Sequence, residues 1–247
     1  LFGDPAMKLP LPKNSISINN ITPDTLKTLE IANIYGNQQI FDGESEGIIY
    51  LLDAEREVTR EYQIYSDIYS LSYSLPGATL FRGQFTFSEN NFSTSIIVPQ
   101  DISYSDYPSR IVIYTNNDSD EACGNLNNIQ IIGGMNTNDQ YGPQISFETI
   151  TGRRLETFDH LPSNENLYIR ISDPLGINIT NETGHEILIT DLDSELSTII
   201  TDDFYYDQNS IQTGTIELDT DGTGKINIEI KAWDNANNPS EKKIILS

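Results

Sequence analysis

The sequence predicts an all-β chain made of two consecutive Ig-like β-sandwich domains. Short segments in which apolar and polar residues alternate recur along the whole chain, and this period is typical of half-buried strands. No stretch keeps a 3.6-residue apolar period for more than about two turns, so we expect little helix. With 247 residues and 37% hydrophobic content, the chain is large enough to bury two cores.

Residues 13–135 are expected to form the first sandwich, with about seven strands spaced roughly 8 to 12 residues apart. Its clearest element is a hairpin at 80–98, where Phe81, Phe85 and Phe87 alternate in one arm and Phe92 and Ile96 in the other. The other strands of this domain are expected within 14–22, 29–36, 47–54, 109–117 and 127–134. Before them, Pro5, Pro10 and Pro12 interrupt any regular element.

The segment MNTNDQYGPQ (135–144) has no periodicity and is rich in Asn, Asp and Gly, which places the domain boundary there. Residues 136–247 then form the second sandwich. Its best-defined stretch is 213–232, where alternating strands flank a DTDGTG turn, so an antiparallel hairpin is predicted. The remaining strands are expected in QISFETI, NLYIRIS, HEILITDL, ELSTIIT and KKIILS.

The charge of the chain excludes several classes of partner. It has 14 Lys and Arg against 37 Asp and Glu, a net charge of −23. Such a surface opposes binding to nucleic acid or to an anionic membrane and favours calcium or basic partners. No run approaches the ~18 apolar residues of a membrane span, and we expect the first residues not to be a signal peptide. The opening LFGDPAMKLPLP is instead expected to be an interior piece of a longer protein.

A cysteine nucleophile requires an imidazole beside it, and the sequence offers only Cys123 with His160 and His185. Cys123 lies in the first predicted domain and both histidines lie in loop-like stretches of the second. We therefore favour a free cysteine and two structural or exposed histidines, and predict no catalytic residue. A serine triad has no support either, because the chain contains no G-x-S-x-G elbow.

The weak candidates for a metal site are Asp219 and Asp221, which with Gly222 resemble the opening of a calcium loop. An EF-hand needs Gly at its sixth position and Glu at its twelfth, and this loop is too short, so an ordinary turn is the favoured interpretation. Two further acidic loops contain Asp118, Asp120 and Glu121, and Asp202, Asp203 and Asp207. We expect no cofactor, and structural calcium is the alternative left open.

Several motifs resemble the C-terminal region of PorU-type sortases of the type IX secretion system, which are gingipain-like cysteine peptidases. In the second half they are GP (142–143), SDPLGIN (172–178), GHEI (184–187), Asp191, DDFYY (202–206) and IKAWDNANN (230–238). In the first half they are FRGQFTF (81–87), FSTSIIVPQDISY (92–104) and DEACGNLNNIQIIGG (120–134). The opening residues 1–12 are similar to the exit from that family's caspase-like catalytic domain.

The resemblance implies that the catalytic His and Cys of the parent lie upstream, so none is carried over to this chain, and His185 matches a structural histidine of the family. It implies a non-catalytic scaffold on the extracellular face of the outer membrane. The parent would remove the C-terminal sorting signal of secreted proteins and attach them to surface glycolipid. Its implied partners are an outer-membrane β-barrel protein, secreted cargo and the upstream catalytic domain.

We expect exposed sheet edges and the aromatic 81–98 hairpin to be the contact surfaces. Tyr62, Tyr65, Tyr69, Tyr73 and Tyr104 are expected to form a phenolic surface or a half-buried face. The alternative function is a stand-alone extracellular adhesin or a carbohydrate- or calcium-binding module.

Overall fold

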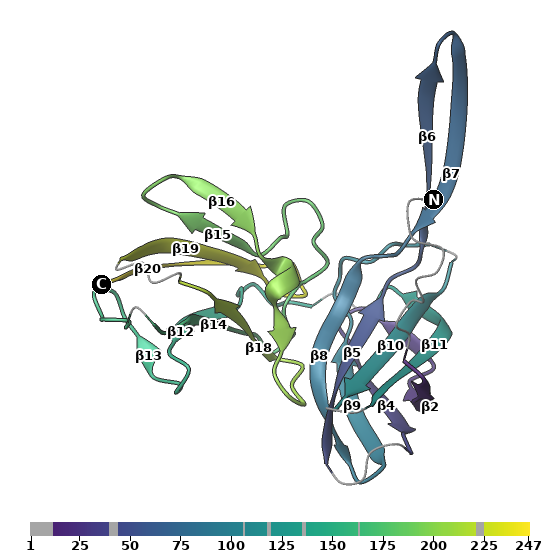
Figure 1. Ribbon diagram of the computed structural model, residues 1–247, viewed down its shortest axis with the longest axis horizontal. Helices are drawn as coiled ribbons and strands as arrows, with labels where there is room; N and C mark the ends of the chain where they lie inside the picture. The colour runs from purple at the N-terminus through teal and green to yellow at the C-terminus, as the bar shows by residue number, and fades with distance from the viewer. Residues whose placement is uncertain are drawn as a thin grey trace.

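The chain is almost entirely β-strand. The computed structural model describes residues 12–39, 44–105, 107–117, 120–134, 137–162, 164–220 and 225–247. Within these residues the one helical element is a short 3₁₀ turn, η1 (Thr201–Asp203). Figure 1 shows two strand-rich bodies side by side and a long two-stranded arm, which confirms the all-β, sandwich-like fold class.

Several of the sequence predictions fall wholly or partly outside the described residues. They include the catalytic-domain tail, of which residues 1–11 are not described, and the domain boundary at 135–136. We refer below to residues 12–134 as the N-terminal half and to residues 137–247 as the C-terminal half. In the part of the chain that is described, no helix has the length and apolar character that a membrane-spanning helix requires.

The N-terminal half is built around the ladder β11-β10-β5-β8, and β8 also pairs with β9, which leads to β4 and β2. Alternating residues of these strands point inward, as period-two patterning requires; in β10, for example, Ile111 and Ile113 are fully buried. The strands outside the arm are β1 (Asn14–Ser15), β2 (Ser17–Thr22), β3 (Thr25–Lys27), β4 (Ile31–Asn37), β5 (Ser45–Leu52), β8 (Thr79–Ser88), β9 (Asn91–Ile97), β10 (Ser109–Asn116) and β11 (Glu121–Ile132).

The aromatic hairpin at 81–98 exists as β8 and β9, but its aromatic face is core and not a contact surface. Phe85, Phe87 and Phe92 are at most 4% exposed, and their ring centroids lie 4.9 to 5.3 Å apart. Tilted packing at such distances is favourable and buries large apolar surfaces. The prediction that this face binds a partner is therefore wrong, because the phenylalanines are needed to fill the N-terminal half.

The C-terminal half is a sandwich of two sheets, β17-β18-β14-β12-β13 and β16-β15-β19-β20. Apolar side chains from both sheets meet between them, including Ile169 and Ile171 of one sheet and Ile230 and Ala232 of the other, all fully buried. The strands are β12 (Gln144–Glu148), β13 (Arg154–Leu155), β14 (Leu167–Ser172), β15 (Leu188–Asp191), β16 (Leu196–Ile199), β17 (Tyr205–Tyr206), β18 (Thr213–Leu218), β19 (Ile226–Trp233) and β20 (Pro239–Leu246).

The predicted hairpin at 213–232 is not a hairpin. β18 pairs with β14 and β17, whereas β19 pairs with β15 and β20, so the connection between them crosses from one sheet to the other. Both strands alternate as predicted and both face the same core. Alternation reports which face of a strand is buried and says nothing of which neighbour it bonds, so the two arrangements look alike in sequence.

One strand contact joins the sheets of the two halves. Tyr206 of β17 pairs in parallel with Gly83 of β8, and the resulting sheet runs through both halves. The rings of Phe81 and Tyr206 stack there, with centroids 4.5 Å apart and planes 11° apart. A Cβ on Gly83 would lie 2.7 Å from the Phe81 ring, so glycine is what allows this close approach.

Candidate functional site

The structure places Cys123 and the two histidines in three different surroundings. Cys123 is an exposed residue of β11, where it pairs with Tyr114 and Ser15. His160 lies in space beside the last residue, Ser247, with its Nδ1 2.6 Å from the Ser247 backbone oxygen. His185 lies between the halves, with Nδ1 2.5 Å from Asp101 Oδ2. Among the described residues, neither histidine hydrogen bonds to Cys123.

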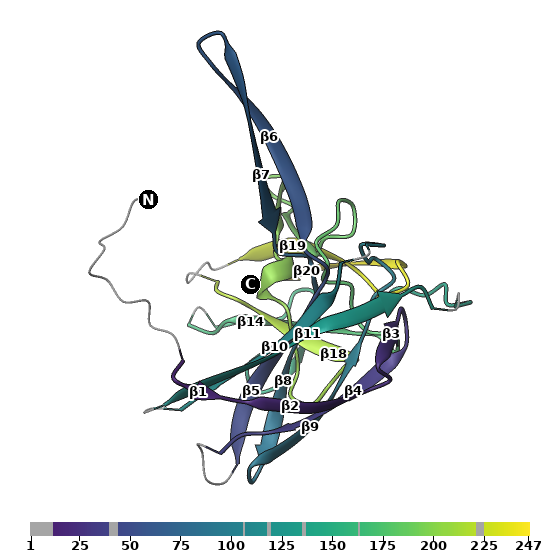
Figure 2. The same ribbon diagram turned by 90° about the vertical axis from the view of Figure 1, so that its right-hand side faces the viewer.

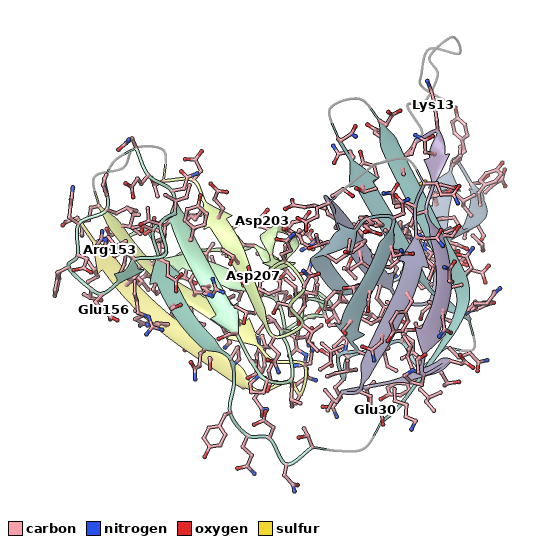
Figure 3. All side chains as sticks on the ribbon, turned by 90° about the horizontal axis from the view of Figure 1, so that it is seen from below. Lys13, Glu30, Arg153, Glu156, Asp203 and Asp207 are labelled. Atoms are coloured by element: carbon pink, nitrogen blue, oxygen red, sulfur yellow. The ribbon has the colours of Figure 1, made fainter. Side chains whose placement is uncertain are left out.

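The calcium candidates are only partly within the described structure. Asp219 follows β18 directly, while Asp221 and the rest of the turn (221–224) lie outside the described residues. In the 202–207 segment, Asp207 lies 3.0 Å from Arg170 and accepts a hydrogen bond from Thr215, and Asp202 lies 3.8 Å from Arg82. Figure 3 shows Asp203 and Asp207 on the side of the C-terminal half that faces the N-terminal half. Asp118, in the remaining loop, is also outside the described residues.

A carboxylate cluster that the sequence analysis missed lies in the C-terminal half. Asp139, Asp173 and Asp234 each offer an oxygen within 4.8 Å of the other two. Asp173 and Asp234 follow the ends of β14 and β19 and are 6% and 0% exposed, while Asp139 comes from the segment that enters the C-terminal half. The SDP and WDN motifs mark the first two positions as strand ends, but nothing in the local sequence around Asp139 joins it to them.

Backbone donors hold the two buried carboxylates in place. Asp173 Oδ1 accepts a hydrogen bond from the Leu175 N–H at 2.7 Å. Asp234 Oδ1 accepts from the Ala236 and Asn238 N–H groups at 2.9 and 2.7 Å, and the Asn238 amide donates to Oδ2 at 2.8 Å. These bonds orient the carboxylates but satisfy only part of their capacity to accept, because each oxygen has two lone pairs.

Burial and mutual repulsion make the charged form of this cluster costly. Burial raises the pKa of Asp173 to about 6, against the opposing Leu175 hydrogen bond, and the negative charges of Asp234 and Asp139 raise it further. Burial also raises the pKa of Asp234, although its bonds from Asn238 and Ala236 act in the opposite direction. Protonation or a bound cation would relieve this cost, and oxygen-only donors suit calcium or magnesium.

A cavity of about 450 Å³ opens beside the cluster, lined in part by Asp139, Asp173, Gln144 and Gln212. Its lining is composed mainly of oxygen-bearing side chains, so these residues could hold a hydrated cation. Among the described residues, this cluster is the place where three carboxylates converge.

The second unusual feature is the arm, a two-stranded ribbon formed by β6 (Arg56–Ile64) and β7 (Asp67–Leu75). Among the described residues, these strands pair only with each other. Figures 1 and 2 show the arm projecting well away from both halves. An isolated two-stranded ribbon is marginal in water, because it buries little apolar surface.

The arm is amphipathic, because residues directly opposite each other in an antiparallel pair share a face. One face carries apolar and aromatic cross-strand pairs, together with two arginines; these pairs are Val58–Tyr73, Tyr62–Tyr69, Arg60–Leu71 and Arg56–Leu75. The opposite face carries mostly hydroxyl and acidic pairs, namely Glu57–Ser74, Thr59–Ser72 and Glu61–Ser70. The arm thus presents one apolar face that nothing in the described chain covers.

Exposure is greatest toward the tip of the arm. Tyr62, Leu71 and Ile64 are 42%, 50% and 51% exposed, and Tyr65 at the turn is 96% exposed. Tyr65 also has φ of 57°, in the left-handed region that a bulky side chain rarely adopts. The expected phenolic surface is therefore present at Tyr62, Tyr65 and Tyr69, but the ribbon that displays it was not predicted.

Comparisons with known proteins find similarity only to solved structures. No protein-family model matches the chain, and no curated protein matches it. Among solved structures, Spo0M, a sporulation control protein from Bacillus subtilis, aligns with 9% identity and a TM-score of 0.27 over 94% of this chain and 89% of that chain, which is too weak to carry an argument.

The dimeric latent PorU from Porphyromonas gingivalis aligns with a TM-score of 0.54 and 24% identity. The match covers 99% of this chain and 25% of PorU, so the chain spans about a quarter of that protein's length. At this level of identity the match establishes the fold and nothing finer. The chain therefore shares the fold of a part of PorU.

Proposed function

We propose that this chain is the non-catalytic C-terminal scaffold and interaction region of a cell-surface type IX secretion sortase. The observation that carries the proposal is the fold shared with PorU over 99% of this chain. The motif resemblance of the sequence, spread over both halves, supports it. The parent would be a cysteine peptidase that removes the sorting signal of secreted proteins and joins them to surface glycolipid on the extracellular face of the outer membrane.

In this role the chain would position the upstream catalytic domain relative to an outer-membrane β-barrel partner and to arriving cargo. The arm is the surface best suited to that contact. Its apolar face combines tyrosines with Arg56 and Arg60, the residue types enriched at the centres of protein interfaces. Both edges of a two-stranded ribbon also offer free backbone groups to a partner strand, which a lipid surface could not satisfy.

A retention experiment tests this proposal. The immobilised chain is incubated with an outer-membrane extract from cells that have type IX secretion, and the bound proteins are identified by mass spectrometry. We expect a β-barrel protein of the secretion system to be retained, and the variant Tyr62→Ser with Leu71→Ser to lose it. Thr59→Ala with Ser70→Ala, on the opposite face of the arm, is the matched control and should retain it.

The outcomes of this experiment separate the proposal from its rivals. Equal retention by both variants would remove the arm from the interaction, and no retained β-barrel protein would contradict the scaffold role. Because PorU is described as dimeric, light scattering on the same samples distinguishes self-association from capture of a second protein. Binding on a glycan array by the chain alone would favour the stand-alone module instead. Peptide turnover that is lost in Cys123→Ala would favour an enzyme.

A further inference from the structure

We propose that the two halves keep a fixed orientation relative to each other and behave as one rigid unit. The proposal rests on two charged side chains of the N-terminal half, Arg82 and Asp101, whose bonding partners are supplied by the C-terminal half. It does not depend on the proposed function, because it uses only contacts within this chain.

Arg82 extends from β8 into the C-terminal half, where its side chain is 9% exposed. Its Nε donates to the backbone oxygen of Phe204 at 2.8 Å and its Nη2 to that of Thr201 at 2.7 Å, so it bonds the carbonyls at the two ends of η1. The guanidinium also lies 4.7 Å from the centre of the Tyr205 ring. Separation of the halves would leave a guanidinium and two carbonyls without these partners.

Asp101, in the segment after β9, receives side-chain donors from three separate segments of the C-terminal half. Its Oδ2 accepts from Asn178 at 2.8 Å and lies 2.5 Å from His185 Nδ1. Its Oδ1 accepts from Asn237 at 2.7 Å. A carboxylate that is bonded by several donors is held in both position and direction, because any movement of it would break at least one of these bonds.

Backbone contacts reinforce these two anchors. The Gln100 N–H donates to the Asn235 oxygen and the Asn209 N–H donates to the Gln84 oxygen, both at 2.8 Å. The Asn209 side chain donates to Thr86 Oγ1 at 2.9 Å, and Gly83 pairs with Tyr206. A hinge normally falls where few contacts cross between domains. Here contacts cross at β8 and again after β9, so rotation about one of them is opposed by the other.

This rigidity has a consequence for the arm. β6 and β7 are inserted between β5 and β8, and β8 is the strand that bears Arg82 and joins the C-terminal half. Residues 76–78 connect the arm to that strand, so the root of the arm lies close in sequence to the junction. A partner that binds at the root of the arm would therefore lie beside the junction of the two halves, because residues of both, such as Pro76 and Asn181, line one cavity there.

Electron–electron distance measurements test the proposal. Cys123 is exposed and is the only cysteine of the sequence, so it takes one spin label. Leu196→Cys on β16, at a position 69% exposed, takes the other in the C-terminal half. We expect a single narrow distance distribution. Arg82→Lys, which loses the planar pair of donors, and Asp101→Asn, which turns an acceptor into a donor, should each broaden it.

Arg110→Lys and Asp24→Asn are matched controls, because Arg110 pairs with Glu55 inside the N-terminal half and Asp24 is exposed. Both should leave the distribution unchanged. Circular dichroism on each variant confirms that it is folded before its distribution is compared. A broad distance distribution, or one with several maxima, in the protein that carries only the two labels would overturn the proposal. An unchanged width in folded Arg82→Lys and Asp101→Asn together would overturn the role of these two side chains.

Discussion

Asp173 illustrates how a single residue can make stability depend on pH. Its pKa in the folded protein is raised to about 6, above the value near 4 expected when it is unfolded. Between these pH values Asp173 holds a proton in the folded protein that it has released in the unfolded chain. Its contribution to the free energy of unfolding is therefore fully present below about pH 4 and is lost as the pH rises through about 6.

We therefore predict that Asp173→Asn stabilises the protein at pH 7 in the presence of EDTA, by roughly 1 to 2 kcal/mol, and flattens its stability between pH 4.5 and 7. Asparagine keeps the Oδ1 acceptor for Leu175 but removes the buried charge. Denaturant unfolding at a series of pH values measures the effect, with exposed Asp24→Asn as the control. An Asp173→Asn variant that is less stable than the unsubstituted protein at pH 7 would contradict the electrostatic account of this cluster.

The same samples distinguish protonation from cation binding at the carboxylate cluster. Calcium would be assigned to Asp139, Asp173 and Asp234 if it raises the unfolding midpoint of the unsubstituted protein but not that of Asp173→Asn. Equal midpoints with and without calcium would leave protonation as the means by which these charges are relieved.

Arg82 and Arg110 provide a second comparison at this scale. We predict that Arg82→Ala lowers the free energy of unfolding by about 3 kcal/mol, because it leaves the Phe204 and Thr201 carbonyls without their charged donor. Arg110→Ala should cost less than about 1 kcal/mol, because Arg110 forms a half-exposed pair with Glu55 at 3.7 Å. Chemical denaturation of both variants measures the difference, and equal losses would show that the Arg82 bonds contribute no more than a surface pair.

At the scale of the element, the arm and the strands of the sandwiches differ in what holds them. β6 and β7 have no ladder partner except each other among the described strands, and most of their residues are exposed. We predict that replacing residues 57–74 by a short Gly-containing turn changes the melting temperature by no more than about 2 °C, since little buried surface is lost. Differential scanning calorimetry checks this. Loss of folding would mean that the arm supports the N-terminal half.

At the scale of the whole molecule, the shared sheet and the junction couple the two halves. We predict a single cooperative unfolding transition seen at the same midpoint by Trp233 fluorescence, which reports on the C-terminal half, and by far-ultraviolet circular dichroism, which reports on both. The reason is that unfolding of either half breaks the stack of Phe81 on Tyr206 and the hydrogen bonds of Arg82, which destabilises the other half. Two separated midpoints would show that the halves unfold independently.

The sequence predicted most strands because their signal is local. Alternation in β19 identified a strand and its buried face correctly, since each side chain's direction follows from its position in the strand. β5, β10 and β14 also lie where strands were predicted. The arm was missed because its strands have one apolar face but no buried one. The tyrosines Tyr62, Tyr65, Tyr69 and Tyr73 predicted a phenolic surface, but they did not predict the two strands that carry it.

The partners of each strand were decided only by the tertiary structure. Whether β18 pairs with β19 or lies opposite it across the core depends on contacts with β14 and β15, which are distant in sequence. The same holds for the cluster of Asp139, Asp173 and Asp234, whose members come from three segments. Burial raises the pKa values of Asp173 and Asp234, and burial belongs to the assembled fold.

By itself, then, the sequence determined that this protein is all-β, strongly acidic and shaped by strands with one buried face, because patterning and charge are properties of neighbouring residues. The tertiary structure decided that the aromatic hairpin is core, that a tyrosine-bearing arm is exposed in its place, and that three carboxylates converge. The physical reason is that exposure, pairing and electrostatic environment depend on which distant segments pack together, and local sequence does not record that packing.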